Sequence, residues 1–259
     1  MRSIKKRVSP GELEDWRGDR AAQNDSVLYP FDYEAMRRNK DVLGKVEDGL
    51  FAEQGQICAY TGRRITRQGK PGLAGFHIEH LKPQERCNLG EDCAYENMVA
   101  CWPEPNQKHG VEYGAVKKDN WPAAGEDHLF VSPLHTDCTG RFRFAEQEDP
   151  QFPGEEPKWS NWMEPATAGD AAAEATIRQL SLNHRELRAL RSTAIFNALI
   201  GPDGTAWPLE RLRNISTGYA QAEGELDAGN DIQLDPFCFA IRQALAFHIE
   251  QREASLAQP

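Results

Sequence analysis

The stretch "GFHIEHLKP", residues 75–83, places His77, Glu79 and His80 within four consecutive positions. Its composition predicts a β-strand, in which His77 and Glu79 face one side and His80 faces the other. Burying these polar groups requires a partner for each of them, so the stretch alone leaves three interpretations open: a solvated loop, a cluster of metal ligands, or a catalytic base. For His77, the sequence favours a structural or phosphate-contacting role over that of a metal ligand.

The segments around this strand predict a small mixed α/β unit. "QICAYTGRRIT", residues 56–66, is typical of two short strands joined by a Thr61-Gly62 turn, and "ENMVACW", residues 96–102, of another strand. A helix can begin at Pro103, where a proline in the first turn is tolerated. Gly110 and Gly114 weaken this helix, because glycine disfavours helical conformation.

The rest of the chain predicts helices. Apolar residues recur at three- and four-residue spacing from Asp32 to Gly55 and again in 173–200, 209–224 and 235–257, the last with Asp235 as N-cap. We therefore expect an α+β, mostly helical fold with a ββα unit embedded between helical regions. The expected parts are an N-terminal helical segment (1–56), a core (57–145), a loop or linker rich in Pro, Gly, Trp and acids (146–170), and a C-terminal helical region packed with the core (171–259).

Composition indicates a soluble globular protein. The 259 residues are 39% hydrophobic and 27% charged, and no apolar run approaches the roughly 18 residues of a membrane span. The basic start "MRSIKKRVSP" has no apolar stretch behind it, so it is not a secretory signal and we expect a cytoplasmic protein. The net charge of −10 argues against a surface covered in nucleic-acid contacts, although residues 62–86 are locally basic.

An ordered set of polar residues in 79–110 carries a resemblance. "EHLKP" at 79–83, "ENMVACW" at 96–102 and "PNQKHG" at 105–110 together resemble the ββα-metal motif of HNH endonucleases. Each element alone is weak, but the set in this order and at these spacings is specific. The resemblance implies His80 as general base, Glu79 and Asn106 as metal ligands, and Asn97 as the residue that fixes the loop orienting His80.

The chemistry of phosphodiester hydrolysis suits these residue types. A histidine can accept a proton near neutral pH, and carboxylate and amide oxygens suit Mg²⁺ or Mn²⁺. We expect the local basic residues to contact nucleic-acid phosphates: Lys82, Arg63, Arg64 and Lys108. His109 is left open between metal ligand and phosphate contact, because it follows Asn106 by three positions where the family often has a histidine at four.

The six cysteines are too sparse for a disulfide scaffold, so we expect thiols or metal ligands. Many HNH domains bind a structural zinc ion through two CxxC pairs. Here these read Cys58-Ala-Tyr-Thr61 and Cys101-Trp-Pro-Glu104, which excludes the usual four-thiolate site and disfavours a zinc-dependent transcription-factor-like domain. Cys87 and Cys93 could replace the missing thiolates beside Cys58 and Cys101. The sequence instead favours Cys58 and Cys101 as small buried hydrophobes, without structural Zn²⁺.

Over a longer range, residues 33–195 resemble the HNH nuclease subunit (PtuB) of Septu-type anti-phage systems and of related retron-associated cassettes. The segments that carry this likeness are "ICAYTGRRI", "HIEHLKP", "YENMVACW" and "ATIRQLSLNHRELRALR". The resemblance implies a controlling PtuA-like ATPase of the ABC/SMC type and, in retron cassettes, a complex of reverse transcriptase and msDNA. The expected substrate is DNA, with RNA including tRNA as the alternative.

Two alternatives stay open beside the nuclease. The chain could be a catalytically silent, HNH-derived module that binds nucleic acid or protein. Separately, the arginines of "RELRALR" (Arg185, Arg188 and Arg191) predict a solvated helix face, or alternatively a surface for nucleic acid or a partner.

Overall fold

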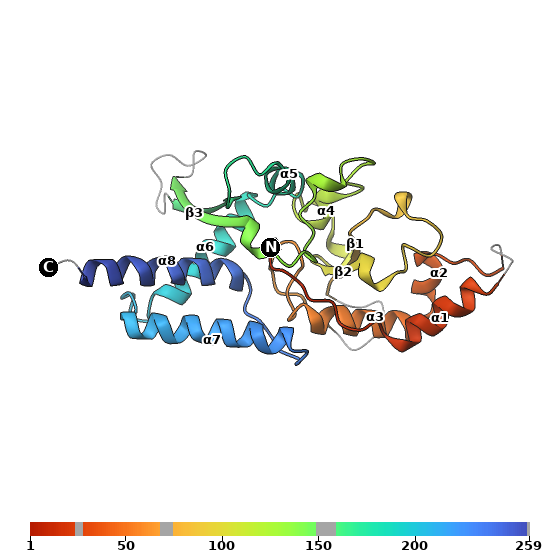
Figure 1. Cartoon of the computed structure of the whole chain (residues 1–259), viewed down its shortest axis with the longest axis horizontal. Coiled ribbons are helices and arrows are strands. Elements are labelled where there is room, and N and C mark those ends of the chain that lie inside the picture. Colours follow the sequence, from red (N-terminus) through yellow and green to blue (C-terminus); the bar gives the residue numbers. More distant parts are fainter. Residues whose placement is uncertain (24–27, 68–74, 149–158, 258–259) are drawn as a thin grey trace.

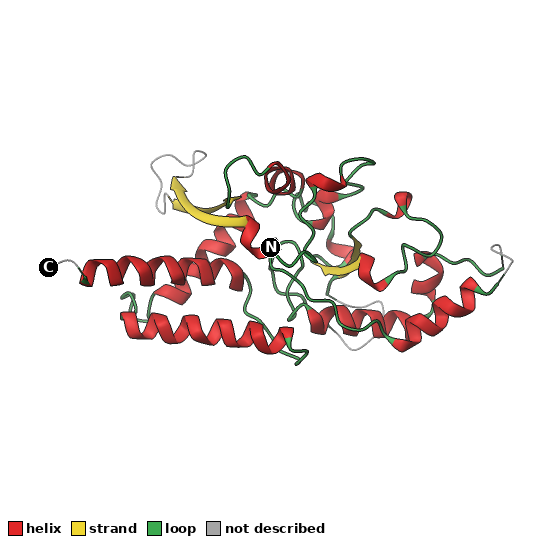
Figure 2. Ribbon diagram, viewed as in Figure 1, coloured by secondary structure: helices red, strands yellow, loops and turns green. Residues whose placement is uncertain are grey.

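The computed structural model describes residues 1–23, 28–67, 75–148 and 159–257 (Figures 1 and 2). The predicted α+β class is confirmed, since about half of the chain is helical and the strands form two separate two-stranded antiparallel sheets. Figure 1 shows α1 to α3 at one end of an elongated molecule, α7 and α8 at the other, and the sheet of β1 and β2 between them. Within the described residues, no helix combines the length and apolar character needed to cross a membrane.

The N-terminal segment contains α1 (Gly11–Ala21), α2 (Tyr33–Arg38) and α3 (Lys40–Glu53). The helix predicted from Asp32 is interrupted at Asn39, because Asn39 leaves helical geometry to cap α3 through a bond from Val42 N to its Oδ1 at 3.3 Å. Asp32 caps α2 in the same way, accepting from Ala35 N at 2.7 Å. The apolar spacing that predicted helix is thus satisfied by two helices with separate caps.

The strands β1 (His77–His80) and β2 (Met98–Cys101) form an antiparallel pair in which His77 lies opposite Cys101 and His80 opposite Met98. Gln54, at the end of α3, binds the outer edge of β2. Its Nε2 donates to Ala100 O at 2.8 Å and its Oε1 accepts from Ala100 N at 2.7 Å, as a neighbouring strand would. The two strands predicted in 56–66 are reduced to one bridge between Ile57 and Arg64 around the turn.

The helix predicted from Pro103 is wrong. A single 3-10 turn, Pro105–Gln107, is followed by the four-residue helix α4 (Ala115–Lys118). Gly110 and Gly114 adopt φ values of 77° and 66°, left-handed geometry that glycine tolerates and that cannot continue a right-handed helix. The structure thus contains an antiparallel pair of strands followed by a short helix that begins beyond Asn106, and the expected ββα unit is not confirmed. Further 3-10 turns lie at Gln84–Arg86, Tyr95–Asn97, Asp127–Leu129 and Cys138–Arg141.

Part of the segment expected as a loop or linker is a strand. The strands β3 (Phe142–Glu148) and β4 (Trp159–Pro165) form an antiparallel pair, in which Phe144 lies opposite Met163. Phe142 and Met163 are buried, which explains why a segment of polar average composition joins a sheet. The centre of the expected loop, 149–158, lies outside the described residues.

The C-terminal region consists of α5 (Ala171–Gln179), α6 (Arg185–Leu199), α7 (Leu209–Asp227) and α8 (Cys238–Leu256). The predicted continuous helix over 173–200 is divided by a turn in which Ser181 has a φ of 47°. Asp235 does not cap α8; its side chain accepts from Tyr219 Oη at 2.8 Å, and the helix starts after Phe237. One continuous apolar core contains residues from α1 to α8, so the two halves pack as one body.

Candidate active site

The β1–β2 hairpin presents Glu79 and His80 to one cavity of about 270 Å³. Lys108, from the segment after β2, reaches the same cavity, and α4 forms another side of it. The remaining lining residues are Pro83, Gln84, Ala115, Val116, Asp119 and Asn120. The structure thus brings together three residues that the sequence predicts for the site: His80 as base, Glu79 as metal ligand and Lys108 as phosphate contact.

His80 is held as a neutral imidazole. Its Nε2 lies 2.8 Å from Asp92 O, and because a carbonyl can only accept, Nε2 carries the hydrogen and Nδ1 keeps its lone pair. Tyr33 packs edge-to-face on the ring at 4.6 Å between centroids. Burial lowers the pKa of His80 to about 4, an effect that the bond to Asp92 O opposes. At neutral pH, His80 is therefore in the form that accepts a proton.

Asn97 fixes the turn that follows His80. Its Oδ1 accepts from Lys82 N at 2.8 Å and its Nδ2 donates to Lys82 O at 3.1 Å, while Leu81 N donates to Asn97 O at 2.9 Å. One amide thereby pairs both backbone groups of Lys82, two residues beyond the imidazole. Its contribution to activity stays a prediction.

Lys118 is the residue of this site that sequence reasoning missed. Its Nζ lies 2.9 Å from Glu79 Oε1 and donates to His80 O at 2.8 Å, and its side chain is fully buried. Burial raises the pKa of Glu79, and the Lys118 ammonium opposes that shift. Nothing in "AVKKD" distinguishes buried Lys118 from exposed Lys117, since the partner lies 39 positions earlier in the chain.

His77 and Glu79 face the same side of β1, with His77 Nε2 3.8 Å from Glu79 Oε2. The other ring nitrogen, Nδ1, lies 2.5 Å from Pro103 O. Burial, with the nearby Lys108 cation, lowers the pKa of His77 to about 4. In the described part of the chain, His77 Nε2 is buried and has no hydrogen-bond partner.

Asn106 and His109 are not brought to the cavity. Asn106 lies in the exposed turn Pro105–Gln107 and His109 follows it, also exposed; among the described residues, neither lines the cavity beside Glu79 and His80. The convergence of Glu79, His80 and Asn106 that the resemblance implies is therefore incomplete in this structure. The shortened helix explains this, because a longer one would hold these side chains on a fixed face.

Three of the four predicted phosphate contacts have partners within the protein. Lys82 pairs with Glu91 at 2.6 Å. Arg63 stacks on Trp102, 3.7 Å from the ring centroid, and pairs with Glu186 at 2.5 Å. Arg64 donates to the carbonyl oxygens of Gln56 and Leu234. Of the four predicted phosphate contacts, Lys108 alone is exposed and lines the cavity.

The cysteines divide into separate places. Cys58 and Cys101 are buried together, and hydrogen bonds from Cys101 and Thr61 outweigh burial and lower the pKa of Cys58 to about 6. Cys87 Sγ donates to Pro83 O at 3.5 Å, and Cys93 Sγ to Gly90 O at 3.3 Å. In the ranges that the structure describes, no three His, Cys, Asp or Glu side chains gather as a metal site.

The prediction of a solvated arginine face on α6 is wrong for Arg188 and Arg191, which are 2% and 1% exposed. Arg191 donates to Leu182 O at 2.7 Å and to Asn161 O at 3.0 Å, and so joins α6 to β4. Arg188 stacks on Trp162 at 4.1 Å. These arginines are part of the internal structure rather than a surface for nucleic acid.

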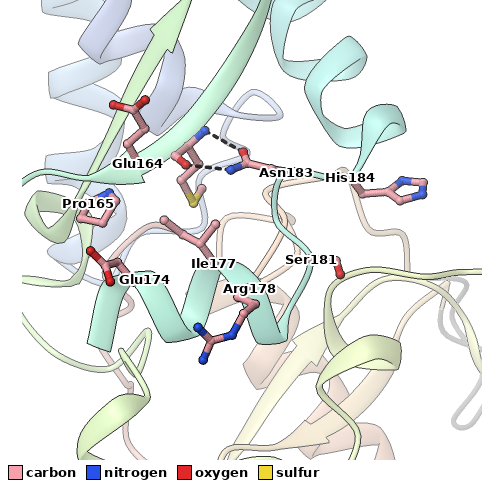
Figure 3. Close-up of a pocket in the computed structure, with 9 residues that line it drawn as sticks. Glu164, Pro165, Glu174, Ile177, Arg178, Ser181, Asn183 and His184 are labelled. Carbon is pink, nitrogen blue, oxygen red and sulfur yellow. Dashed lines mark hydrogen bonds between the residues drawn. The ribbon is translucent and has the colours of Figure 1, made fainter. Parts of the chain in front are cut away.

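A second, mainly apolar pocket of about 470 Å³ lies between β4 and α5 (Figure 3). At its edge, Asn183 repeats the pattern of Asn97: Oδ1 accepts from Met163 N at 2.7 Å and Nδ2 donates to Met163 O at 2.8 Å. His184 points away from the labelled carboxylates Glu164 and Glu174. The "LSLNH" segment thus has a structural explanation, because it anchors β4.

Comparison with known proteins identifies no family for this chain. No protein-family model matches the chain, and no curated protein sequence matches it.

Proposed function

We propose that the protein is a metal-dependent endonuclease of the HNH type that hydrolyses phosphodiester bonds, with DNA as the favoured substrate and RNA, including tRNA, as the alternative. The observation that carries the proposal is that His80, a neutral imidazole, lines one cavity together with Glu79 and Lys108. Asn97 clamps the turn that leaves this imidazole, which keeps its orientation.

The side chains divide the chemistry between them. His80 Nδ1 accepts the proton of the attacking water, which requires the lone pair that the bond from Nε2 to Asp92 O leaves free. Lys108 binds the phosphate and offsets its charge. Glu79 offers a carboxylate oxygen to Mg²⁺ or Mn²⁺, which when bound supplies charge neutralisation at the phosphate and the departing oxygen. Asn106, the other expected ligand, lies in an exposed turn and is not among the described residues that line this cavity.

Delivery of the substrate is assigned to a partner. The net charge of −10 and the internal pairing of Lys82, Arg63 and Arg64 leave little basic surface at the site. We therefore expect weak intrinsic affinity for duplex DNA, with control by a PtuA-like ATPase of the ABC/SMC type, and in retron cassettes by a reverse transcriptase–msDNA complex. Tight binding of duplex DNA by the isolated chain at physiological salt would contradict this expectation.

The test of the nuclease is conversion of supercoiled plasmid to nicked and linear forms with Mg²⁺ or Mn²⁺. We expect His80→Ala to lower the rate by roughly 10²–10⁴-fold, the usual contribution of a positioned base. The control is His128→Ala, at an exposed histidine in the 3-10 turn Asp127–Leu129. Equal nicking by wild type and His80→Ala would remove the proposed mechanism. Repeating the assay with the purified ATPase and ATP tests whether cleavage requires the partner.

One observation favours the rival, a catalytically silent interaction module. Lys118 already neutralises Glu79, and Asn106 lies on an exposed turn, so the metal site of an active HNH enzyme is incomplete without further ligands. The two functions differ in outcome: a silent module binds nucleic acid or protein without cleaving either strand under any divalent cation, with or without the ATPase.

A further inference from the structure

A buried nitrogen of His77 lies near Glu79, a residue that lines the cavity. His77 is 6% exposed, its Nδ1 lies 2.5 Å from Pro103 O, and its Nε2 is buried without a hydrogen-bond partner among the described residues. Because a carbonyl only accepts, Nδ1 carries the hydrogen and Nε2 keeps a lone pair. A buried polar atom without a partner lowers the stability of the folded state by about 1–3 kcal/mol. A ligand that binds this lone pair would therefore stabilise the site.

The nitrogen that carries this lone pair lies near the Glu79 carboxylate. The two carboxylate oxygens of Glu79 have different neighbours. Oε1 lies 2.9 Å from Lys118 Nζ, and Oε2 lies 3.8 Å from His77 Nε2. A separation of 3.8 Å is too long for a hydrogen bond. Two ligands that each bind one cation at about 2.1 Å lie roughly 3.0–3.4 Å apart, so a side-chain shift of about 0.5 Å places both on one ion.

We propose that His77 Nε2 and Glu79 Oε2 are two ligands of the same divalent cation, and that the site therefore prefers Mn²⁺ or another transition ion to Mg²⁺. Imidazole is a poor ligand for Mg²⁺ and a good one for transition ions. Metal-binding histidines usually donate the hydrogen of their other ring nitrogen to a carbonyl or carboxylate oxygen, as His77 Nδ1 does to Pro103 O. This inference rests on the proposed nuclease site and deepens it, giving His77 a role that the sequence did not favour.

The charges around the pair determine when the cation binds. Lys118 offsets the charge of Glu79, so His77 and Glu79 carry little net negative charge together. A substrate phosphate held by Lys108 in the adjoining cavity supplies the missing negative charge and further oxygen ligands. We therefore expect Mn²⁺ affinity to rise when a duplex oligonucleotide is present.

The experiment uses the full chain carrying His80→Ala, which prevents turnover of the DNA duplex that is added in excess. Mn²⁺ binding is measured by titration calorimetry with and without a short DNA duplex, and ¹⁴N coordination by electron spin-echo envelope modulation of bound Mn²⁺. We expect a histidine nitrogen signal that His77→Asn removes. The Mn²⁺ affinity should fall by more than the roughly 10–100-fold that follows when a metal ligand loses the residue that orients it. Asparagine can still donate to Pro103 O but has no atom at the Nε2 position.

The matched control is His109→Asn, which removes the exposed histidine beside the expected ligand Asn106. It should keep the nitrogen signal and the affinity. Should His77→Asn unfold, ¹⁵N-histidine labelling of the His109→Asn chain tests imidazole coordination without altering His77. Absence of any histidine signal, or unchanged Mn²⁺ affinity in folded His77→Asn, overturns the proposal.

Failure of the metal site and failure of the nuclease are distinguishable. If Mn²⁺ binds through His77 while the chain with an intact His80 cleaves no plasmid, the metal site stands and the nuclease fails. If folded His77→Asn cleaves plasmid at the wild-type rate in Mg²⁺ and Mn²⁺, the nuclease stands and His77 is not a ligand.

Discussion

At the scale of the residue, the site is defined by protonation states that burial enforces. His77 and His80 each use one ring nitrogen to contact a backbone carbonyl, Pro103 O and Asp92 O, and burial keeps both imidazoles neutral. Spacing alone indicated that His77 and Glu79 share a face, but not that His77 Nε2 would lie near the Glu79 carboxylate with no hydrogen-bond partner among the residues that the structure describes.

These protonation states predict a dependence of stability on pH. Both histidines have a folded pKa of about 4, below the unfolded value of about 6.5, so the unfolded chain binds more protons between these values and stability falls as pH falls from 6.5 to 4. The loss should reach roughly 3 kcal/mol per histidine. Urea unfolding in EDTA at pH 7.0, 5.5 and 4.5 measures it, and His77→Asn should flatten the profile. An equal slope in this variant would contradict the assignment.

A second prediction concerns the buried ion pair. Lys118→Met removes the ammonium and leaves Glu79 buried without its partner, which should destabilise the protein by about 3 kcal/mol in EDTA. If Glu79 binds a cation, added Mn²⁺ should restore part of that stability. The control is Lys117→Met at the exposed neighbouring lysine, which should change stability by less than about 0.5 kcal/mol. Urea midpoints with and without Mn²⁺ report both effects.

At the scale of the element, two asparagines act as clamps between segments. Asn97 pairs both backbone groups of Lys82 after β1, and Asn183 pairs both backbone groups of Met163 in β4. The resemblance to HNH endonucleases implied that Asn97 fixes the turn after His80, and its bonds to Lys82 lie within the β1–β2 hairpin. The helix expected at Pro103 failed for an equally local reason, the left-handed geometry at Gly110 and Gly114.

The clamp leads to a prediction for the turn after β1. Asn97→Asp keeps the acceptor for Lys82 N but replaces the donor to Lys82 O with an oxygen that repels it. We expect a loss of about 1–2 kcal/mol and faster amide exchange at Leu81 and Lys82. Asn183→Asp is the matched comparison, since it should loosen β4 and leave exchange at Lys82 unchanged. Hydrogen exchange read by mass spectrometry separates the two outcomes.

At the scale of the whole molecule, one core unites the two ends of the chain. Backbone bonds from Leu234 N to Gly55 O and from Phe237 N to Gly62 O tie the segment before α8 to the region beside the site. Arg191 of α6 is buried against β4 and the turn before α6. Its guanidinium donates to two carbonyl oxygens, Leu182 O and Asn161 O. We therefore expect a single cooperative unfolding transition rather than separate N- and C-terminal transitions.

Arg191→Ala tests this arrangement. It removes the donors that Leu182 O and Asn161 O use and leaves a cavity in the core, so we expect a loss of about 3 kcal/mol or more in the same single transition. Exposed Arg178→Ala, on α5, should be nearly neutral. Urea unfolding followed by circular dichroism and by tryptophan fluorescence checks both. A separate early transition for the C-terminal helices would contradict the single core.

The sequence by itself determined what depends on neighbours along the chain. Periodic apolar residues indicated the helices of both ends, and the polar cluster at 77–80 marked the hairpin that faces the cavity, because side-chain period and capping act over a few residues. Only the tertiary structure decided that Lys118 neutralises Glu79, that Arg191 is buried, that Asn106 stays on an exposed turn, and that His77 Nε2 has no hydrogen-bond partner in the described part of the chain. These outcomes depend on which distant segments pack together and which polar atoms they leave in contact, and no local pattern of residues encodes that pairing.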